Sequence, residues 1–115
     1  MTIEEIRKIL EAEVIFSEDE EVKIDMVCGS DLMSDVLAFV KNNSLLLTGI
    51  INPQVIRTAE MVGIKAICFV RGKMPQDETI ELAKEIGIPL LRTSLPMYES
   101  CGRLYQAGIC GCYGR

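Results

Sequence analysis

Residues 45–70 read LLLTGIINPQVIRTAEMVGIKAICFV, and this stretch decides the fold. It begins and ends with continuous apolar runs, residues 45–48 and 66–70, which are typical of strands buried on both faces. Between them, Asn52 and the proline after it indicate a helix start, and Gly63 indicates the helix end. A strand, a helix and a second strand in this order predict two parallel neighbours joined by a crossover.

The same alternation of helix and strand extends to both sides of this stretch. The phrases GIKAI at 63–67 and GIPLL at 87–91 mark two successive joints between a helix and a strand. The apolar spacing and the capping residues predict the remaining elements. These are helices over 3–12 with a capping box at Thr2 and Glu5, from a cap at Ser30 or Asp31 to Val40, from a cap at Asp77 to Ile86, and over 97–107, and strands over 13–16, 22–28 and 89–91.

These elements predict a single α/β domain, a layered sandwich with a mostly parallel sheet and helices on both faces. We expect this domain to occupy residues 1–109 and residues 110–115 to form a cysteine-containing tail. A chain of 115 residues, about half of them apolar, is long enough for one real core.

Composition excludes several classes of function. The chain has no histidine, which removes histidine acid–base chemistry and histidine-ligated metals. No apolar run approaches the length of a membrane span, and acidic residues near the start do not fit a signal peptide, so we expect a cytoplasmic protein without membrane contact. Residues 1–35 hold eleven acids against three bases, a net charge of −8, while the rest carries +3. This acidic front argues against a nucleic-acid partner, because phosphate binding needs a basic face.

Polar residues gather where the predicted strands end. In open α/β sheets, ligands bind beyond the carboxyl ends of the strands, and a helix start there adds free N–H groups. This edge predicts a site for a small anionic, nucleotide-like ligand such as a nucleotide or phosphorylated metabolite. In the alternative, glycines serve tight turns and polar residues serve as caps. Neither standard nucleotide loop is present. The candidate ligand-binding residues are Ser30, Asp31, Thr48, Gly49, Asn52, Arg71 and Gly72.

No catalytic constellation stands out. A nucleophilic serine or cysteine needs a base, and without histidine only lysine or a carboxylate could serve. Cys28 ends a strand just before a helix start, where its pKa would fall, but a packed cysteine at a strand end is the alternative. We therefore expect a protein that is not an enzyme.

Three of the five cysteines crowd the end of the chain, at Cys101, Cys110 and Cys112. Three thiolates could hold zinc or an iron–sulfur cluster, but a fourth ligand is missing and the spacing matches no common motif. A flexible tail with reduced thiols is the alternative, and so is a cluster shared between two subunits. We expect no metal and no cofactor, and keep a redox or iron–sulfur accessory protein as the second hypothesis.

Several stretches carry a family resemblance over about residues 3–109. They are CGSDLMSDVLAF at 28–39, LLLTG at 45–49, NPQVIRTAE at 52–60 and IPLL at 88–91. With these the chain resembles DRTGG-domain proteins, especially small stand-alone members. The resemblance implies a fold similar to the N-terminal domain of HPr kinase/phosphorylase. Family members also occur beside CBS domains in regulatory pyrophosphatases and inside some phosphotransacetylases, which implies a regulatory or dimerising module. The namesake string is absent here, since residues 49–53 read GIINP.

These observations predict a non-catalytic regulatory module that senses a small ligand or docks on a metabolic or signalling protein. We also expect a homodimer, because tyrosine and methionine are enriched at protein interfaces. The last predicted helix carries a wide apolar and aromatic stripe, which in the alternative only covers the sheet. The stripe consists of Met97, Tyr98, Cys101, Leu104, Tyr105 and Ile109.

Overall fold

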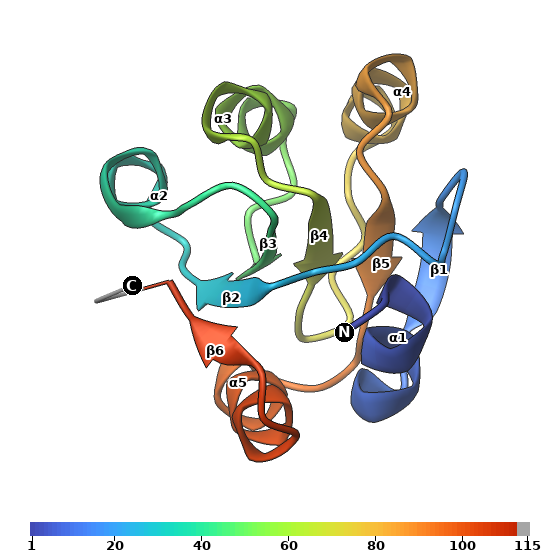
Figure 1. Cartoon of the computed structure of the whole chain (residues 1–115). Helices are drawn as coiled ribbons and strands as arrows, with labels where there is room; N and C mark the ends of the chain where they lie inside the picture. Colours follow the sequence, from blue (N-terminus) through green and yellow to red (C-terminus); the bar gives the residue numbers. More distant parts are fainter. Residues whose placement is uncertain (113–115) are drawn as a thin grey trace.

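A computed structural model describes residues 1–112 of the chain (Figure 1). Helices and strands alternate along most of its length, as the hydrophobic pattern predicts. None of the helices in this range is long and apolar enough to cross a bilayer. In chain order the elements are α1 (Ile3–Leu10), β1 (Glu13–Phe16), β2 (Met26–Gly29), α2 (Met33–Phe39), β3 (Ser44–Thr48), α3 (Gln54–Val62), β4 (Ala66–Phe69), α4 (Asp77–Ile86), β5 (Leu90–Arg92), α5 (Met97–Gln106) and β6 (Cys110–Gly111).

The strands form one six-stranded sheet in the order β1-β5-β4-β3-β2-β6. Strands β2 to β6 pair with one another in parallel, and only β1 pairs antiparallel, with β5. The chain steps from β2 to β5 one neighbour at a time, and α5 then carries it back across the sheet to β6 beside β2 (Figure 1). The predicted fold class, a mostly parallel α/β sandwich, is therefore confirmed.

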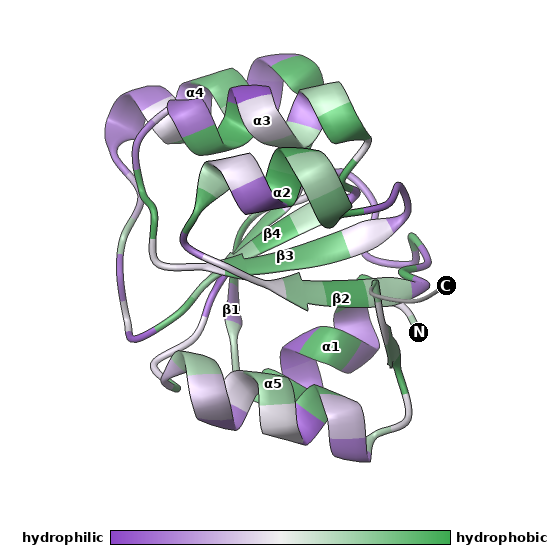
Figure 2. Ribbon diagram, turned by 90° about the vertical axis from the view of Figure 1, so that its left-hand side faces the viewer, coloured by the Kyte–Doolittle hydropathy of each residue, from purple (hydrophilic) through white to green (hydrophobic). Residues whose placement is uncertain are grey.

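The central strands bury every residue, because helices cover both faces of the sheet. Helices α2, α3 and α4 lie on one face, and α1 and α5 lie on the other (Figure 2). Side chains of a strand alternate between faces. Leu45 and Leu47 accordingly pack with α1 and α5, and Leu46 between them packs with α2, α3 and α4.

The predicted helix ends are found where local chemistry fixes them. Thr2 and Glu5 form the expected capping box on α1, with each side chain accepting a hydrogen bond from the other's backbone N–H. Gly63 and Gly87 end α3 and α4 at φ of 78° and 91°, a left-handed conformation that glycine adopts at little cost. These two glycines produce the repeated joints between helix and strand.

Two predicted caps differ from the structure. Neither Ser30 nor Asp31 caps α2, whose N-cap is Leu32 without a side-chain hydrogen bond. The carboxylate of Asp31 instead binds groups on β3, as described below. The N-cap of α4 is Gln76, and Asp77 is the first residue of that helix.

Strand β2 begins at Met26, four residues later than predicted. The preceding residues pair with the N-terminal segment instead, through an isolated bridge between Thr2 and Lys23. The Ile24 N–H donates to the carbonyl of Met1 at 2.7 Å. Residues 22–28 alternate as predicted, but they have two different pairing partners. Residues 22–24 pair with the N-terminal segment, and the residues from Met26 on pair with β3.

Residues 110–111, expected to begin the tail, form the edge strand β6. They pair with β2, with Met26 opposite Cys110 and Val27 opposite Gly111. The part of the expected tail at 113–115 lies outside the described residues. The cysteine-containing segment therefore begins as part of the sheet.

Candidate functional site

The parallel strands bring all seven candidate ligand-binding residues to the carboxyl edge of the sheet. Each follows or ends one of three neighbouring strands, so the expected clustering follows from the strand order. The side chains differ in what they contact. Four residues come together around the end of β3, and the other three serve their own turns. The first group comprises Asp31, Thr48, Gly49 and Arg71, and the second Ser30, Asn52 and Gly72.

Asp31 joins the end of β2 to the end of β3. Its Oδ1 accepts a hydrogen bond from the Gly49 N–H at 2.7 Å and another from the Thr48 hydroxyl at 3.0 Å. Gly49 is buried, so its N–H needs an acceptor, and a carboxylate is a strong one. The other oxygen, Oδ2, accepts no hydrogen bond from residues 1–112.

Arg71 reaches the same point from the end of β4. A Cβ built on Gly49 would lie 3.5 Å from Arg71 Nη2 and 3.6 Å from both carboxylate oxygens of Asp31. Arginine and aspartate therefore flank the bare backbone of Gly49. They form no ion pair, since no carboxylate of the described residues lies within 4.0 Å of the Arg71 guanidinium.

Backbone geometry holds Arg71 in this place. Its φ of 58° is in the left-handed region, which is uncommon for a residue other than glycine. Its N–H donates to the Leu95 carbonyl at 2.8 Å, and the N–H of Gly72 donates to the Thr93 carbonyl at 2.8 Å. The loop after β4 is thus tied to the loop after β5.

These two hydrogen bonds lie where the topology predicts a ligand crevice. A ligand crevice is expected where neighbouring strands send their connections to opposite faces of the sheet. Here β4 leads to α4 on one face and β5 leads to α5 on the other (Figure 2). The loops after β4 and β5 bind each other there, and Arg71 and Asp31 flank Gly49 one strand further along, at the end of β3.

The remaining candidates stabilise local turns. Ser30 Oγ accepts a hydrogen bond from the Leu32 N–H at 3.1 Å. Asn52 Oδ1 accepts one from the Gln54 N–H at 3.0 Å, at the start of α3. Gly72 has a φ of 68°, which the turn after Arg71 requires. The turn-and-cap interpretation of these three residues agrees with their contacts.

The cysteines of the alternative metal site lie on different elements. Cys101 is half-buried on α5, Cys110 is exposed on β6, and Cys112 is buried with its Sγ 3.2 Å from Ser44 Oγ. Within the described part of the chain, no three His, Cys, Asp or Glu side chains gather as a metal ion would need.

The buried thiols are poor nucleophiles at neutral pH. Burial, with smaller contributions from Cys112 and Cys101, raises the pKa of Cys28 to about 11. Burial alone raises the pKa of Cys68 to about 12 and raises that of Cys101. The hypothesis that a helix start lowers the pKa of Cys28 is wrong, because loss of solvent around the thiol outweighs it.

The model of the DRTGG domain matches residues 5–107, nearly the whole chain. The chain belongs to the DRTGG-domain family. No curated protein matches it in sequence. A similar fold occurs in the crystal structure of the CBS and DRTGG domains of the regulatory region of Clostridium perfringens pyrophosphatase, complexed with the activator diadenosine tetraphosphate. The TM-score is 0.69 at 15% identity over 92% of this chain.

The family expectation from the sequence is therefore confirmed. This DRTGG domain spans about half of the pyrophosphatase regulatory chain, covering 46% of it. At 15% identity the likeness shows the shared fold. The Arg71 and Asp31 arrangement described above comes from this chain alone.

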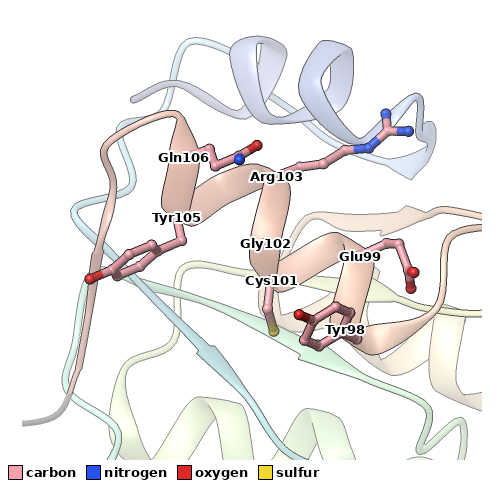
Figure 3. A pocket seen from close by; sticks show the side chains of 7 residues that line it. All are labelled: Tyr98, Glu99, Cys101, Gly102, Arg103, Tyr105 and Gln106. Carbon is pink, nitrogen blue, oxygen red and sulfur yellow. The ribbon is translucent and has the colours of Figure 1, made fainter.

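The outer surface of α5 in this DRTGG domain is a second exposed feature. Tyr98 and Tyr105 are 84% and 78% exposed, on either side of Gly102 (Figure 3). A Cβ at Gly102 would meet nothing within 4 Å. Together with neighbouring side chains of α5, these residues line an open hollow of about 590 Å³.

The predicted stripe on α5 divides between two surfaces. Leu104 and Ile109 are buried against the sheet, as the covering alternative requires. Cys101 lies close over the end of β2, where a Cβ at Gly29 would be only 2.9 Å from its Sγ. Only the two tyrosines point away from the core. Sequence spacing missed Gly29 and Gly102, because nothing local shows that α5 approaches one of them and leaves the other open.

Proposed function

We propose that this DRTGG domain is a cytoplasmic, non-catalytic regulatory module that binds a small phosphorylated ligand of nucleotide type. The ligand would bind at the carboxyl edge of the sheet, with Arg71 as the group that holds its phosphate. A metabolic or signalling protein would recognise the ligand-bound form of the domain. The observation that carries the proposal is the position of the Arg71 guanidinium, which lies beside the bare backbone of Gly49 and forms no ion pair among residues 1–112.

Comparison with other arginines supports this role. Arg7, Arg92 and Arg103 each bind a carboxylate at 2.7–2.8 Å. Arg57 on α3 and Arg71 form no ion pair among residues 1–112. Of these two, Arg71 lies beside Gly49 with Asp31, and its planar fork of donors matches a phosphate with two parallel hydrogen bonds. The regulatory region with the similar fold was crystallised with a nucleotide activator, which makes nucleotides the first ligands to try.

We propose a non-catalytic module because the chain lacks the side chains that catalysis would need. Acyl or phosphoryl transfer needs a nucleophile with a base beside it. The chain has no histidine, and the raised pKa values of Cys28 and Cys68 keep these thiols protonated near neutral pH. Binding without turnover is therefore what the edge supports best.

Thermal unfolding with and without ligand tests the proposal. The probes are ATP, AMP, diadenosine tetraphosphate and ribose 5-phosphate. A ligand present at about 100 times its Kd should add about 2.7 kcal/mol of stability. We expect at least one probe to raise the Tm of the wild-type chain and to lose most of this effect with Arg71→Gln. Lys73→Gln is the matched control, since Lys73 is exposed on the same loop.

A second variant separates loss of binding from loss of fold. In Gly49→Ala the new methyl would make ordinary contacts of 3.5–3.6 Å with Arg71 and Asp31, so the chain should fold normally. The methyl would occupy the space between the two charged side chains, and binding should fall. The proposal is overturned if no probe shifts the Tm, or if both Arg71→Gln and Gly49→Ala bind like the wild type.

We further propose that the module is a homodimer formed through α5. The supporting observation is the exposure of Tyr98 and Tyr105 around the hollow at Gly102, which lets a second helix approach closely (Figure 3). Large exposed aromatic side chains are common at interfaces between proteins. Sedimentation at high micromolar concentration should give a dimer, and Tyr98→Ser with Tyr105→Ser should give a monomer. A wild-type monomer of 12.8 kDa would contradict the assembly.

A further inference from the structure

We propose that Asp31 makes this edge selective for phosphorylated compounds that also carry free hydroxyl groups, such as nucleotides and sugar phosphates, over simple inorganic anions. The inference rests on the proposed function, because it concerns the same site. It assigns Asp31 as the residue that determines specificity and names the chemistry of the ligand on each side of Gly49.

Three backbone donors in the turn after β3 are already engaged. The N–H of Gly49 donates to Asp31, that of Ile50 to Thr48 Oγ1 at 3.1 Å, and that of Gln54 to Asn52 at 3.0 Å. An anion at a helix start normally binds such free N–H groups. Here it would have to break existing hydrogen bonds to reach them.

The carboxylate of Asp31 occupies the place beside the Gly49 N–H that an anion would take. Asp31 Oδ1 lies 2.7 Å from the Gly49 nitrogen and also accepts from Thr48. A phosphate or sulfate approaching this point would meet a like charge at close range, which is unfavourable. Small anions are therefore kept away from the turn after β3.

The side chains of Arg71 and Asp31 offer a ligand complementary contacts on the two sides of Gly49. Arg71 presents N–H donors, and Asp31 Oδ2 presents an acceptor without a hydrogen bond from the described residues. Both lie within 3.6 Å of the Cβ position of Gly49. A ligand that bridges them must place an anion at Arg71 and a hydrogen-bond donor at Asp31.

A hydroxylated phosphate compound meets both requirements. Its phosphate would pair with the guanidinium, and its hydroxyls would donate to the carboxylate, as ribose hydroxyls do to acidic residues at other nucleotide sites. Inorganic phosphate and triphosphate satisfy Arg71 but add negative charge beside Asp31. They should bind more weakly than a nucleotide that carries the same phosphates.

The test compares three probes that share a triphosphate: ATP, 2′,3′-dideoxy-ATP and inorganic triphosphate. Calorimetric titration of the wild-type chain should rank ATP first, with dideoxy-ATP weaker by about tenfold or more, since a hydrogen bond to a charged group is lost. Inorganic triphosphate should bind more weakly than ATP.

Asp31→Asn is the decisive variant. Its amide oxygen can still accept from the Gly49 N–H, so the fold should persist, but its negative charge is gone. We expect ATP to lose its advantage over dideoxy-ATP and inorganic triphosphate to bind better than it binds the wild type. Asp35→Asn, an exposed carboxylate nearby on α2, is the matched control and should behave like the wild type.

The outcomes separate this inference from the proposed function. If ATP and dideoxy-ATP bind the wild type equally through Arg71, and Asp31→Asn changes neither, the role of Asp31 is refuted while the phosphate site stands. If ATP binds Arg71→Gln as well as it binds the wild type, the proposed site fails and this inference fails with it. If none of the triphosphates binds, this inference fails, whereas the proposed site stands if AMP or ribose 5-phosphate still raises the Tm through Arg71.

Discussion

The carboxyl edge of the sheet and the outer face of α5 are both exposed to solvent, yet their side chains are engaged to different extents. At the edge, polar groups bind one another, as Asp31 binds the ends of β3 and the loop after β4 binds the loop after β5. On α5, Tyr98 and Tyr105 are largely free of contacts, and Gly102 between them faces open space.

This difference shows that residue type alone does not define an available binding group. The Thr48 hydroxyl and the Gly49 N–H are donors suited to a phosphate ligand, but both already donate to Asp31. Around Gly49, the guanidinium of Arg71 and one oxygen of Asp31 have no hydrogen bond with the described residues. What remains on α5 is aromatic surface. In our proposals the two regions accordingly bind different partners, a small charged molecule at the edge and another protein surface at α5.

The largest effect on stability is expected from Asp31→Ala. Removing the carboxylate leaves the buried N–H of Gly49 and the hydroxyl of Thr48 without their acceptor. Because the carboxylate is partly exposed and water can replace it, the free energy of unfolding should fall by about 1 to 2 kcal/mol. Urea denaturation measures this change. Asp25→Ala removes an exposed carboxylate that accepts no hydrogen bond from residues 1–112, and an equal loss there would contradict the explanation.

A substitution on the inner face of α5 is expected to raise the free energy of unfolding instead of lowering it. The hydroxyl of Ser100 is fully buried and has no hydrogen-bond partner within the described chain. Ser100→Ala should raise the free energy of unfolding by about 1 kcal/mol, since an unsatisfied buried hydroxyl is removed. Thr93→Val is the comparison, because the Thr93 hydroxyl donates to the Leu10 carbonyl at 2.7 Å and its loss should be destabilising. A destabilised Ser100→Ala would show that this hydroxyl is satisfied.

A smaller gain is expected at Gly102, on the outer face of the same helix. Alanine there meets no atom within 4 Å and favours the helix, so Gly102→Ala should stabilise the monomer by about 0.5 to 1 kcal/mol. The added methyl should weaken the proposed dimer, because it would separate the two α5 helices where the proposal brings them together. Chemical denaturation at low concentration and sedimentation at high concentration measure the two effects. An unchanged dimer would place the interface elsewhere.

The smallest change in stability is expected from Tyr98→Ser and Tyr105→Ser. Both side chains are mostly exposed, so each substitution should alter the free energy of unfolding of the monomer by less than about 0.5 kcal/mol. Urea denaturation at low protein concentration provides the measurement. A loss well above about 1 kcal/mol would mean that the rings stabilise the fold itself, and the contrast with the carboxyl edge would disappear.

Much of the fold could be predicted because its signals are local. Continuous apolar runs predict β3 and β4, and Gly63 and Gly87 predict the ends of the helices between strands. The pairing of residues 22–24 with the N-terminal segment and the addition of β6 to the sheet could not be predicted in this way. Both depend on contacts with distant segments, which leave no periodic pattern in the sequence.

In the candidate site, too, local signals predict some features, and others depend on distant segments. Strand ends place the seven candidate residues at one edge, because parallel strands share a direction. Local spacing suggested that Asp31 caps its own helix, whereas its carboxylate binds Thr48 and Gly49, which are 17 and 18 residues away. A short side chain near a strand end can bind either its own turn or the next strand. The choice depends on the position of that strand.

The return of the chain to β6 has a consequence for synthesis on the ribosome. Strand β2 gains its second neighbour only from residues 110–111, roughly 80 residues further along the chain. At about 5 to 20 residues per second, this takes about 4 to 16 seconds. During that time β2 presents an open edge, and the face of the sheet carrying Leu45 and Leu47 lacks α5. Open edges and uncovered apolar faces invite pairing with other chains, so the growing chain should depend on chaperones until α5 is made.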